Sequence, residues 1–406
     1  MKKTVKIVLA FSAMMTMTMA AFAQNSNSFN ATAGTIRNDV NYSMDPRYFQ
    51  EADFSDFITY LNVNIDKDKT IGGEPHKGGY LDLGFEKKIS DLTLGAYYYG
   101  DMWGNAYGHK YVKTPGTVVS EEVTVETTTD QCKNDFGILA GYKIFGLKLD
   151  FAIDANSSKT VVTTTPKNES ATEEITKSSS TDFKFGGTFG ASLDLSPFTL
   201  KPLASFGYNN NNKEGEKAFL MSLGSDFVFG KGSAEHIAGI LYSLSAGSKE
   251  TSSETVSHPV NSINLYYKAH FDLGSKAEIG ARVNVINKFD SYKETSKNNN
   301  ETIENKFTYD LISTAAIGVK LNATQDFAFN TGIDVILPNV HSVSYPDSSI
   351  KSYETTSNCD FPTTIYAGCD LNIGKNWLLD ASVDFKLGNV GSSIFSALTL
   401  GVSYRK

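Results

Sequence analysis

The chain has 406 residues, of which 37 are lysine or arginine and 45 are aspartate or glutamate, giving a formal net charge of −8 at pH 7. This acidic balance argues against the basic face that nucleic-acid binding requires, so we expect no nucleic-acid partner. Only ten prolines and 12% aromatic residues, mostly Phe and Tyr, favour β structure.

The first residues have the pattern of a secretory signal peptide. Lys2, Lys3 and Lys6 form a positive start, and a mainly apolar stretch follows as far as Phe22. The sequence Ala21-Phe22-Ala23 is the small-x-small pattern that a signal peptidase recognises. We therefore expect residues 1–23 to be a cleaved signal peptide. No later run reaches the roughly 18 apolar residues of a transmembrane helix.

Residues 24–54 show no clear periodicity and are predicted to be an N-terminal periplasmic segment or a plug. From residue 55 the pattern has a period of two, as in 147–153, where Leu147, Leu149 and Phe151 alternate with polar residues. The runs are about ten residues or longer, the length of a tilted strand that crosses a bilayer. Strands of soluble proteins are shorter, typically about five or six residues.

Runs of this kind recur along the whole chain. In order they are 55–66, 78–88, 90–102, 135–145, 146–156, 181–195, 198–208, 217–230, 235–247, 260–273, 276–287, 306–321, 326–337, 360–373, 376–387 and 393–405. They predict an all-β chain that forms a single antiparallel transmembrane β-barrel over residues 55–406. The expected number of strands is about 16, with 14 and 18 as alternatives.

The connections between the runs alternate in length. Lys88-Ile89, Ser196-Pro197 and Gly274-Ser275 are short, whereas 103–134, 157–180, 248–259, 288–305 and 338–359 are long. Bacterial barrels place tight turns in the periplasm and long loops outside the cell. The last run also resembles the terminal strand by which outer-membrane barrels are recognised for assembly, although it ends in Arg405-Lys406 rather than on an aromatic residue. We therefore expect an outer-membrane location, with membrane lipid as a partner.

Charged residues within the runs predict a polar lumen. An Arg or Lys facing hydrocarbon at mid-depth costs roughly 2–4 kcal/mol, so the charged parity of each strand should face inward. The pore-lining candidates are Lys148, Asp150, Asp154, Lys184, Asp194, Glu278, Arg282, Lys320, Asp334, Asp370, Asp380, Asp384 and Lys386. Their acidic excess suggests a mild preference for cations. Pairing of these charges along the wall is the equal alternative.

Three further features concern the loops and the cysteines. Glu121, Glu122 and Glu126 are candidates for a constriction loop, although the Thr/Val repetition around them equally suits an exposed hairpin. Cys132 and Cys359 lie at the inner edges of two long loops and are candidates for a disulfide, while Cys369 has lipid-facing parity. The spacing fits no zinc or redox motif. No catalytic constellation is evident, so we expect neither an enzyme nor a cofactor.

Taken together, three features resemble the major surface proteins of treponemes, a family of spirochaete outer-membrane proteins. These are the lysine-led signal ending in Ala21-Phe22-Ala23, the alternating strands rich in Gly, Tyr and Phe, and the Thr/Asn-rich loops. The resemblance spans the chain but includes no specific motif, so it carries over no functional residue. It implies a porin-like, antigenic protein of the cell surface that in some members adheres to host matrix.

Two functions follow as expectations. The first is a porin-like channel for passive diffusion of small hydrophilic solutes that is also a major surface antigen. The alternative is a surface adhesin whose extracellular loops bind host matrix proteins, with the barrel as a scaffold. Uptake of hydrophobic compounds would require a plugged lumen and an apolar pocket, and the sequence shows no such apolar cluster. Porins of this size are often trimers, which makes a homotrimer the candidate assembly.

Overall fold

The computed structural model describes most of the chain from residue 31 onward. The described residues are 31–36, 45–52, 54–71, 74–100, 108–115, 121–166, 172–211, 216–230, 232–251, 253–299, 301–345, 353–358, 363–387 and 395–406. The expected signal peptide, residues 1–23, lies outside them.

Most of the described residues are in β-strands. Among the described residues, a turn of 3-10 helix, η1 (Phe49–Glu51), comes shortly before the first strand. The strands are β1 (Phe57–Ile71), β2 (Glu74–Ile89), β3 (Leu92–Gly100), β4 (Gly108–Pro115), β5 (Glu121–Tyr142), β6 (Phe145–Pro166), β7 (Thr172–Ala191), β8 (Leu193–Asp194), β9 (Phe198–Asn211), β10 (Glu216–Phe229), β11 (Ala234–Glu250), β12 (Glu254–Asp272), β13 (Ala277–Ser296), β14 (Thr302–Asn322), β15 (Phe327–Ile336), β16 (Asn339–Ser344), β17 (Tyr353–Asn358), β18 (Thr363–Ile373), β19 (Trp377–Leu387) and β20 (Phe395–Arg405).

In the described part of the chain, 16 of these strands close into one antiparallel barrel. Around the wall they are β1, β2, β3, β5, β6, β7, β9, β10, β11, β12, β13, β14, β15, β18, β19 and β20. Closure comes from β20 pairing with β1, in a register that sets Leu61 opposite Val402. The predicted barrel is confirmed, and each of the 16 predicted runs overlaps one strand of the wall.

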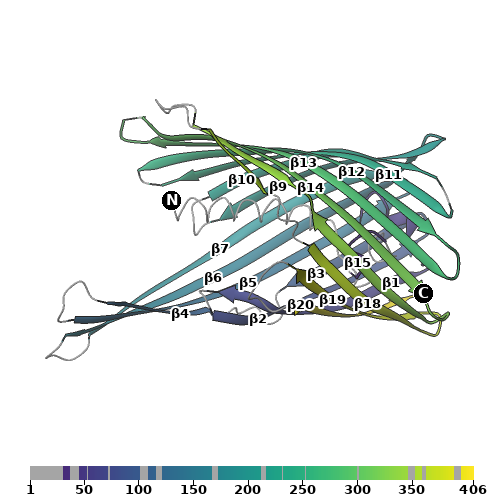
Figure 1. Ribbon diagram of the computed structural model, residues 1–406, viewed down its shortest axis with the longest axis horizontal. Helices are drawn as coiled ribbons and strands as arrows, with labels where there is room; N and C mark the ends of the chain where they lie inside the picture. The colour runs from purple at the N-terminus through teal and green to yellow at the C-terminus, as the bar shows by residue number, and fades with distance from the viewer. Residues whose placement is uncertain are drawn as a thin grey trace.

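The remaining strands extend the wall at its two ends. β4, β16 and β17 lie at the end of the long loops, where β4 pairs with β5, and β16 pairs with β14 and β17. The short strand β8 pairs with β9 at the end of the short turns. In Figure 1 the ends of β4, β5, β6 and β7 project well beyond the rest of the barrel. The sequence predicts long loops here, with an exposed hairpin as the alternative around residues 121–126, because the Thr/Ser composition lacks the apolar alternation of a membrane strand.

Glycine closes several of the short turns. Gly274 and Gly374 have φ angles of +74° and +65°, a backbone conformation that side chains with a Cβ rarely adopt. These turns all lie at the end of the barrel that carries Lys406, whose carbonyl accepts hydrogen bonds from the backbone N–H groups of Ser55 and Asp56 at 3.0 and 2.6 Å. By the usual arrangement of bacterial barrels this is the periplasmic end.

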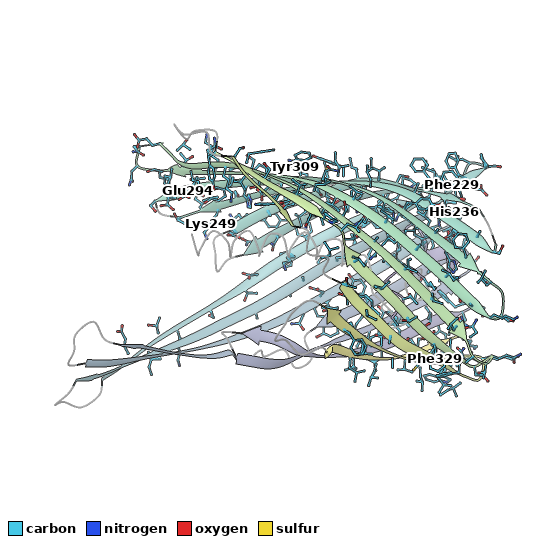
Figure 2. All side chains as sticks on the ribbon, viewed as in Figure 1. Phe229, His236, Lys249, Glu294, Tyr309 and Phe329 are labelled. Carbon is cyan, nitrogen blue, oxygen red and sulfur yellow. The ribbon has the colours of Figure 1, made fainter. Side chains whose placement is uncertain are left out.

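The outer face of the wall is apolar. Phe151, Leu223, Ile317 and many similar side chains are exposed, with 42%, 50% and 53% of their surface accessible for these three. Aromatic rings gather at the periplasmic end, where Trp377 packs on Tyr404 with 4.8 Å between ring centroids. Figure 2 shows Phe229, His236 and Phe329 at that end and Lys249 and Glu294 toward the other. An apolar band with an aromatic girdle is the exterior of a membrane-spanning barrel.

Candidate functional site in the lumen

Successive residues of each strand point to opposite sides of the wall. The polar residues that alternate with the apolar, outward-facing ones therefore lie on the inner face. Lys148, Lys201 and Asp226 face inward and expose 1%, 1% and 0% of their surface. Side chains in a water-filled lumen would be hydrated, so such deep burial means that other parts of the protein cover these groups. For Lys201 and Asp226 part of this cover is the N-terminal segment, which contacts both side chains.

Residues 31–36 and 45–52, which we call the strap, lie inside the barrel. Ala31, Thr32, Tyr48 and Phe49 are each no more than 2% exposed. In Figure 1 part of this purple segment is visible behind the strands, toward the end that carries the C-terminus. The strap has no strand of its own, and the backbone hydrogen bonds described for it are local, such as Thr35 N to Thr32 O and Phe49 N to Asp45 O.

Asp226 on β10 is the main anchor of the strap. Its carboxylate accepts a hydrogen bond from Tyr48 Oη at 2.6 Å and forms an ion pair with Arg47 Nη1 at 3.0 Å. Tyr266 on β12 also donates a hydrogen bond to this carboxylate. Asp45 accepts from the other edge of the Arg47 guanidinium at 3.0 and 3.1 Å. A buried charge is tolerated only when it is paired and hydrogen-bonded, and this cluster satisfies both conditions.

Two lysines of the wall also bind the strap or the residues that follow it. Lys201, directly opposite Asp226 in the β9–β10 register, places its ammonium 3.7 Å from the centre of the Tyr48 ring and pairs with Glu51. Lys88 on β2 donates to the backbone carbonyls of Ala52 and Phe54 at 2.9 and 3.1 Å. Cation–π contacts and charge-assisted hydrogen bonds of this kind are among the stronger polar contacts in proteins. The wall therefore binds the strap through basic and acidic groups alike.

Most described candidates for pore lining have inward parity, and several of them form ion pairs. Lys148 Nζ lies 3.4 Å from Asp150, which also accepts a hydrogen bond from Tyr97. Arg282 reaches over Ala316 to Asp334, with a distance of 3.1 Å. Lys184 has inward parity on β7 beside buried Asp182 and Thr188. The structure thus shows charge pairing along the wall, which was one of the two alternatives.

The acidic candidates on β18 and β19 form a second group. Asp370 lies opposite Asp380 in the strand register and is 3.1 Å from Lys320 Nζ, and its other oxygen accepts from Asn330 at 2.6 Å. Asp384 is further along β19 and lies opposite Tyr366. On β13, Glu278 lies 3.1 Å from His270 Nε2.

A cavity of about 210 Å3 opens at the periplasmic end of the lumen. Its charged lining comes from Glu278, Lys320, Asp370, Lys375 and Arg405. Among the described residues, no group of three or more His, Cys, Asp or Glu side chains is arranged to hold a metal ion. None of the described helices is long and apolar enough to span a membrane.

Several candidates from the sequence lie elsewhere. Asp194 is exposed in β8, at a periplasmic turn rather than in the lumen, because β7 ends at Ala191 and the chain turns there; its carboxylate accepts from Ser196 N at 3.3 Å. The side chains of Asp154, Lys386 and Cys132, and the whole of Cys359, lie outside the described residues, so the disulfide stays a prediction. Cys369 is a free cysteine.

The candidate constriction loop does not fold into the barrel. Glu121, Glu122 and Glu126 lie on β5, where the backbone pairs with β4 on one side and β6 on the other in the projecting part of the sheet. Their side chains lie outside the described residues. The backbone here is part of a continuous sheet that projects beyond the wall, so it follows the exposed-hairpin alternative rather than a loop folded into the lumen.

Sequence reasoning missed the residues that bind the strap. Asp226 and Lys201 have the inward parity that selected Lys148, so the same rule would have found them. Arg47 and Tyr48 gave no periodic signal, because the strap is not a strand. Their role appears only when residues distant in sequence, such as Tyr48 and Asp226, are brought together by the closed wall.

No protein-family model matches the chain, and no curated protein matches it. Among solved structures it is similar to the toluene transporter TodX of P. putida, with 12% identity, 94% of this chain and 97% of the other covered, and a TM-score of 0.42. It is also similar to a bacterial polysaccharide outer membrane secretin (7% identity, 86% and 98% covered, TM-score 0.41) and to a mutant of the Rh. blastica porin (8% identity, 86% and 98% covered, TM-score 0.33). These likenesses are too distant to carry a function. None of the three is a spirochaete surface protein, so that resemblance stays a prediction.

Proposed function

We propose that the protein is an outer-membrane channel for small hydrophilic solutes, with the strap restricting its periplasmic end. The observation that carries the proposal is the contrast between the two faces of the closed wall. The outer face exposes large apolar side chains, while the inner face carries ion pairs such as Arg282–Asp334 and Lys320–Asp370. A wall of about 16 strands encloses more space than its own side chains fill.

The test is conductance of the refolded protein, residues 24–406, in a planar lipid bilayer. We expect stepwise currents that depend on salt concentration. Insertion is checked separately by heat-modifiable migration on gels and by resistance of the barrel to protease. A protein that inserts by both criteria but passes no current, even after the strap has been displaced, would overturn the channel proposal.

The projecting sheet supports adhesion as a second function. Residues 121–130 of β5 pair with 157–166 of β6, and residues 158–164 of β6 pair with 172–178 of β7, so three neighbouring strands continue together beyond the wall. A rigid extension of this kind presents a surface to other molecules at a distance from the membrane. Binding to immobilised host matrix proteins, compared between the full chain and a variant with the projecting sheet shortened, tests this role. Equal binding by both proteins contradicts it.

A further inference from the structure

The strap rests on two rows of glycine in the wall. In the first row Gly280, Gly318 and Gly332 lie directly opposite one another on β13, β14 and β15. In the second row Gly141, Gly146 and Gly190 lie opposite one another on β5, β6 and β7. Each row therefore leaves three neighbouring strands without a side chain at one level of the inner face.

The first row is in contact with the backbone of residues 32–35. A Cβ atom added at Gly318 would lie 2.2 Å from Thr32 O, and one at Gly280 would lie 2.7 Å from Thr35 O. At Gly332 the added Cβ would lie 2.6 Å from both the Thr32 carbonyl carbon and the Ala33 nitrogen. Backbone atoms cannot rotate away as side chains do, so only glycine permits this approach.

The second row fits the other part of the strap. An added Cβ at Gly146 would lie 2.3 Å from Pro46 O, and at Gly190 it would lie 2.8 Å from Pro46 C. At Gly141 it would meet the Phe49 ring at 2.2 Å. Both parts of the strap therefore sit in grooves whose shape depends on the absence of side chains.

The two rows lie on nearly opposite sides of the barrel. Their central strands are β6 and β14. Between them the wall has β7, β9, β10, β11, β12 and β13 on one side and β15, β18, β19, β20, β1, β2, β3 and β5 on the other. The two described parts of the strap thus contact facing walls of the barrel.

The contacts also allow the strap to leave. The backbone hydrogen bonds described for residues 31–36 and 45–52 are local to those residues, and the wall pairs strand to strand without them. If the strap left, Asp226 would still accept from Tyr266 and face Lys201 across the strand register. Release therefore breaks side-chain contacts and no part of the β-ladder, which is the pattern expected of a segment that opens locally.

We propose that the glycine rows are a built seat for the strap and that the seated strap is a gate, so that flux through the lumen rises when the strap leaves its seat. The gate rests on the proposed channel function, whereas the seat does not. The chain's own residues 31–36 and 45–52 are the occupant of the seat.

The test is a triple substitution, Gly280→Ala, Gly318→Ala and Gly332→Ala, compared with Gly207→Ala. The three methyl groups would fall on strap atoms, whereas a Cβ at Gly207 would find its nearest neighbours at 3.5 Å, an ordinary contact. We expect the triple variant, refolded in lipid vesicles, to lose residues 24–52 to added protease, while the wild type and the control retain them. In planar bilayers the triple variant should conduct more than either.

A second test uses an engineered, reducible disulfide between the strap and the wall. Ala33→Cys with Gly332→Cys brings two Cβ positions to 2.9 Å, slightly closer than the roughly 3.5–4.5 Å of a disulfide, so a small shift suffices. The pair is made with Cys132, Cys359 and Cys369 replaced by serine. The oxidised protein should show the lowest conductance, with no spontaneous openings. Reductant should raise the conductance above the wild-type level, because the side chain added at Gly332 then meets the backbone of residues 32–33 with no covalent bond to hold the strap in place. The single Ala33→Cys variant should not respond.

The outcomes separate the two proposals. A triple variant whose strap stays as protected as that of the control overturns the seat. Loss of the strap without a rise in the conductance of an otherwise conducting barrel overturns the gate. Loss of the strap in a barrel that never conducts overturns the channel function and leaves the seat standing.

Discussion

Tyr266 on β12 donates a hydrogen bond to Asp226 on β10 by passing over Gly239 of the intervening strand. A Cβ added at Gly239 would lie 2.1 Å from the Tyr266 ring. Tyr97 reaches Asp150 in the same way, across Gly137 on β5. Glycine thus lets a tyrosine connect strands that are not neighbours, and it places Tyr266 where it supports the anchor of the strap.

Gly239→Val should destabilise the barrel by displacing Tyr266. We expect a loss of about 1–3 kcal/mol, because an inserted side chain forces its neighbours out of position. Tyr266→Phe, which removes only the hydroxyl, should cost about as much as a hydrogen bond to a charged group, roughly 1.5–3 kcal/mol. Urea unfolding in lipid vesicles measures both. Equal stability of Gly239→Val and the wild type would show that the position of Tyr266 does not depend on the absence of a side chain at Gly239.

The parity of β10 predicts effects of very different size for two adjacent residues. Leu223 is exposed on the outer face, and Ser222 on the inner face shares a hydrogen bond of 2.9 Å with Ser243. Leu223→Arg should destabilise the inserted barrel by about 2–4 kcal/mol, the cost of a cation in hydrocarbon. Ser222→Arg, in contact with the lumen, should cost much less. The same unfolding measurement compares them, and a reversed order would contradict the assigned faces.

The Arg47–Asp226 pair should couple the strap to the wall. In a double-mutant cycle with Arg47→Gln and Asp226→Asn, we expect a coupling energy of about 1–3 kcal/mol in strap protection. Protection is read as the rate at which protease removes residues 24–52 from the inserted protein. The exposed pair Lys297–Glu250, with 2.7 Å between charged atoms, is a matched control and should show no coupling to the strap. Additive effects of the two substitutions would mean that the ion pair does not hold the strap.

The carboxylates on β19 should favour cations in the lumen. Asp380→Asn combined with Asp384→Asn should move the reversal potential in a salt gradient toward chloride, because carboxylates that face a pore attract cations. Asp194→Asn is the control, since Asp194 lies at a turn outside the lumen and should leave the potential unchanged. A chloride preference in the unmodified protein would contradict the cation hypothesis outright.

The sequence alone determined the barrel. The alternation of 147–153 and of similar runs can bury one face in lipid only if the strands close on themselves, since an open edge in the bilayer would leave backbone groups unpaired. Run length and the alternating loop lengths then set about 16 strands and the direction of the turns. Local pattern was sufficient here because a period of two assigns every side chain to one face.

Tertiary structure alone decided what occupies the lumen. Asp194 followed the parity of β7, yet the chain turns at Ala191 and takes it out of the wall. Arg47 and Tyr48 lie in a segment without periodicity, and their partner Asp226 is 178 residues beyond Tyr48 in the chain. The glycine rows are scattered through six strands and become rows only in the register of the closed sheet. A seat of this kind depends on contacts between distant segments, and periodicity within a single strand carries no information about them.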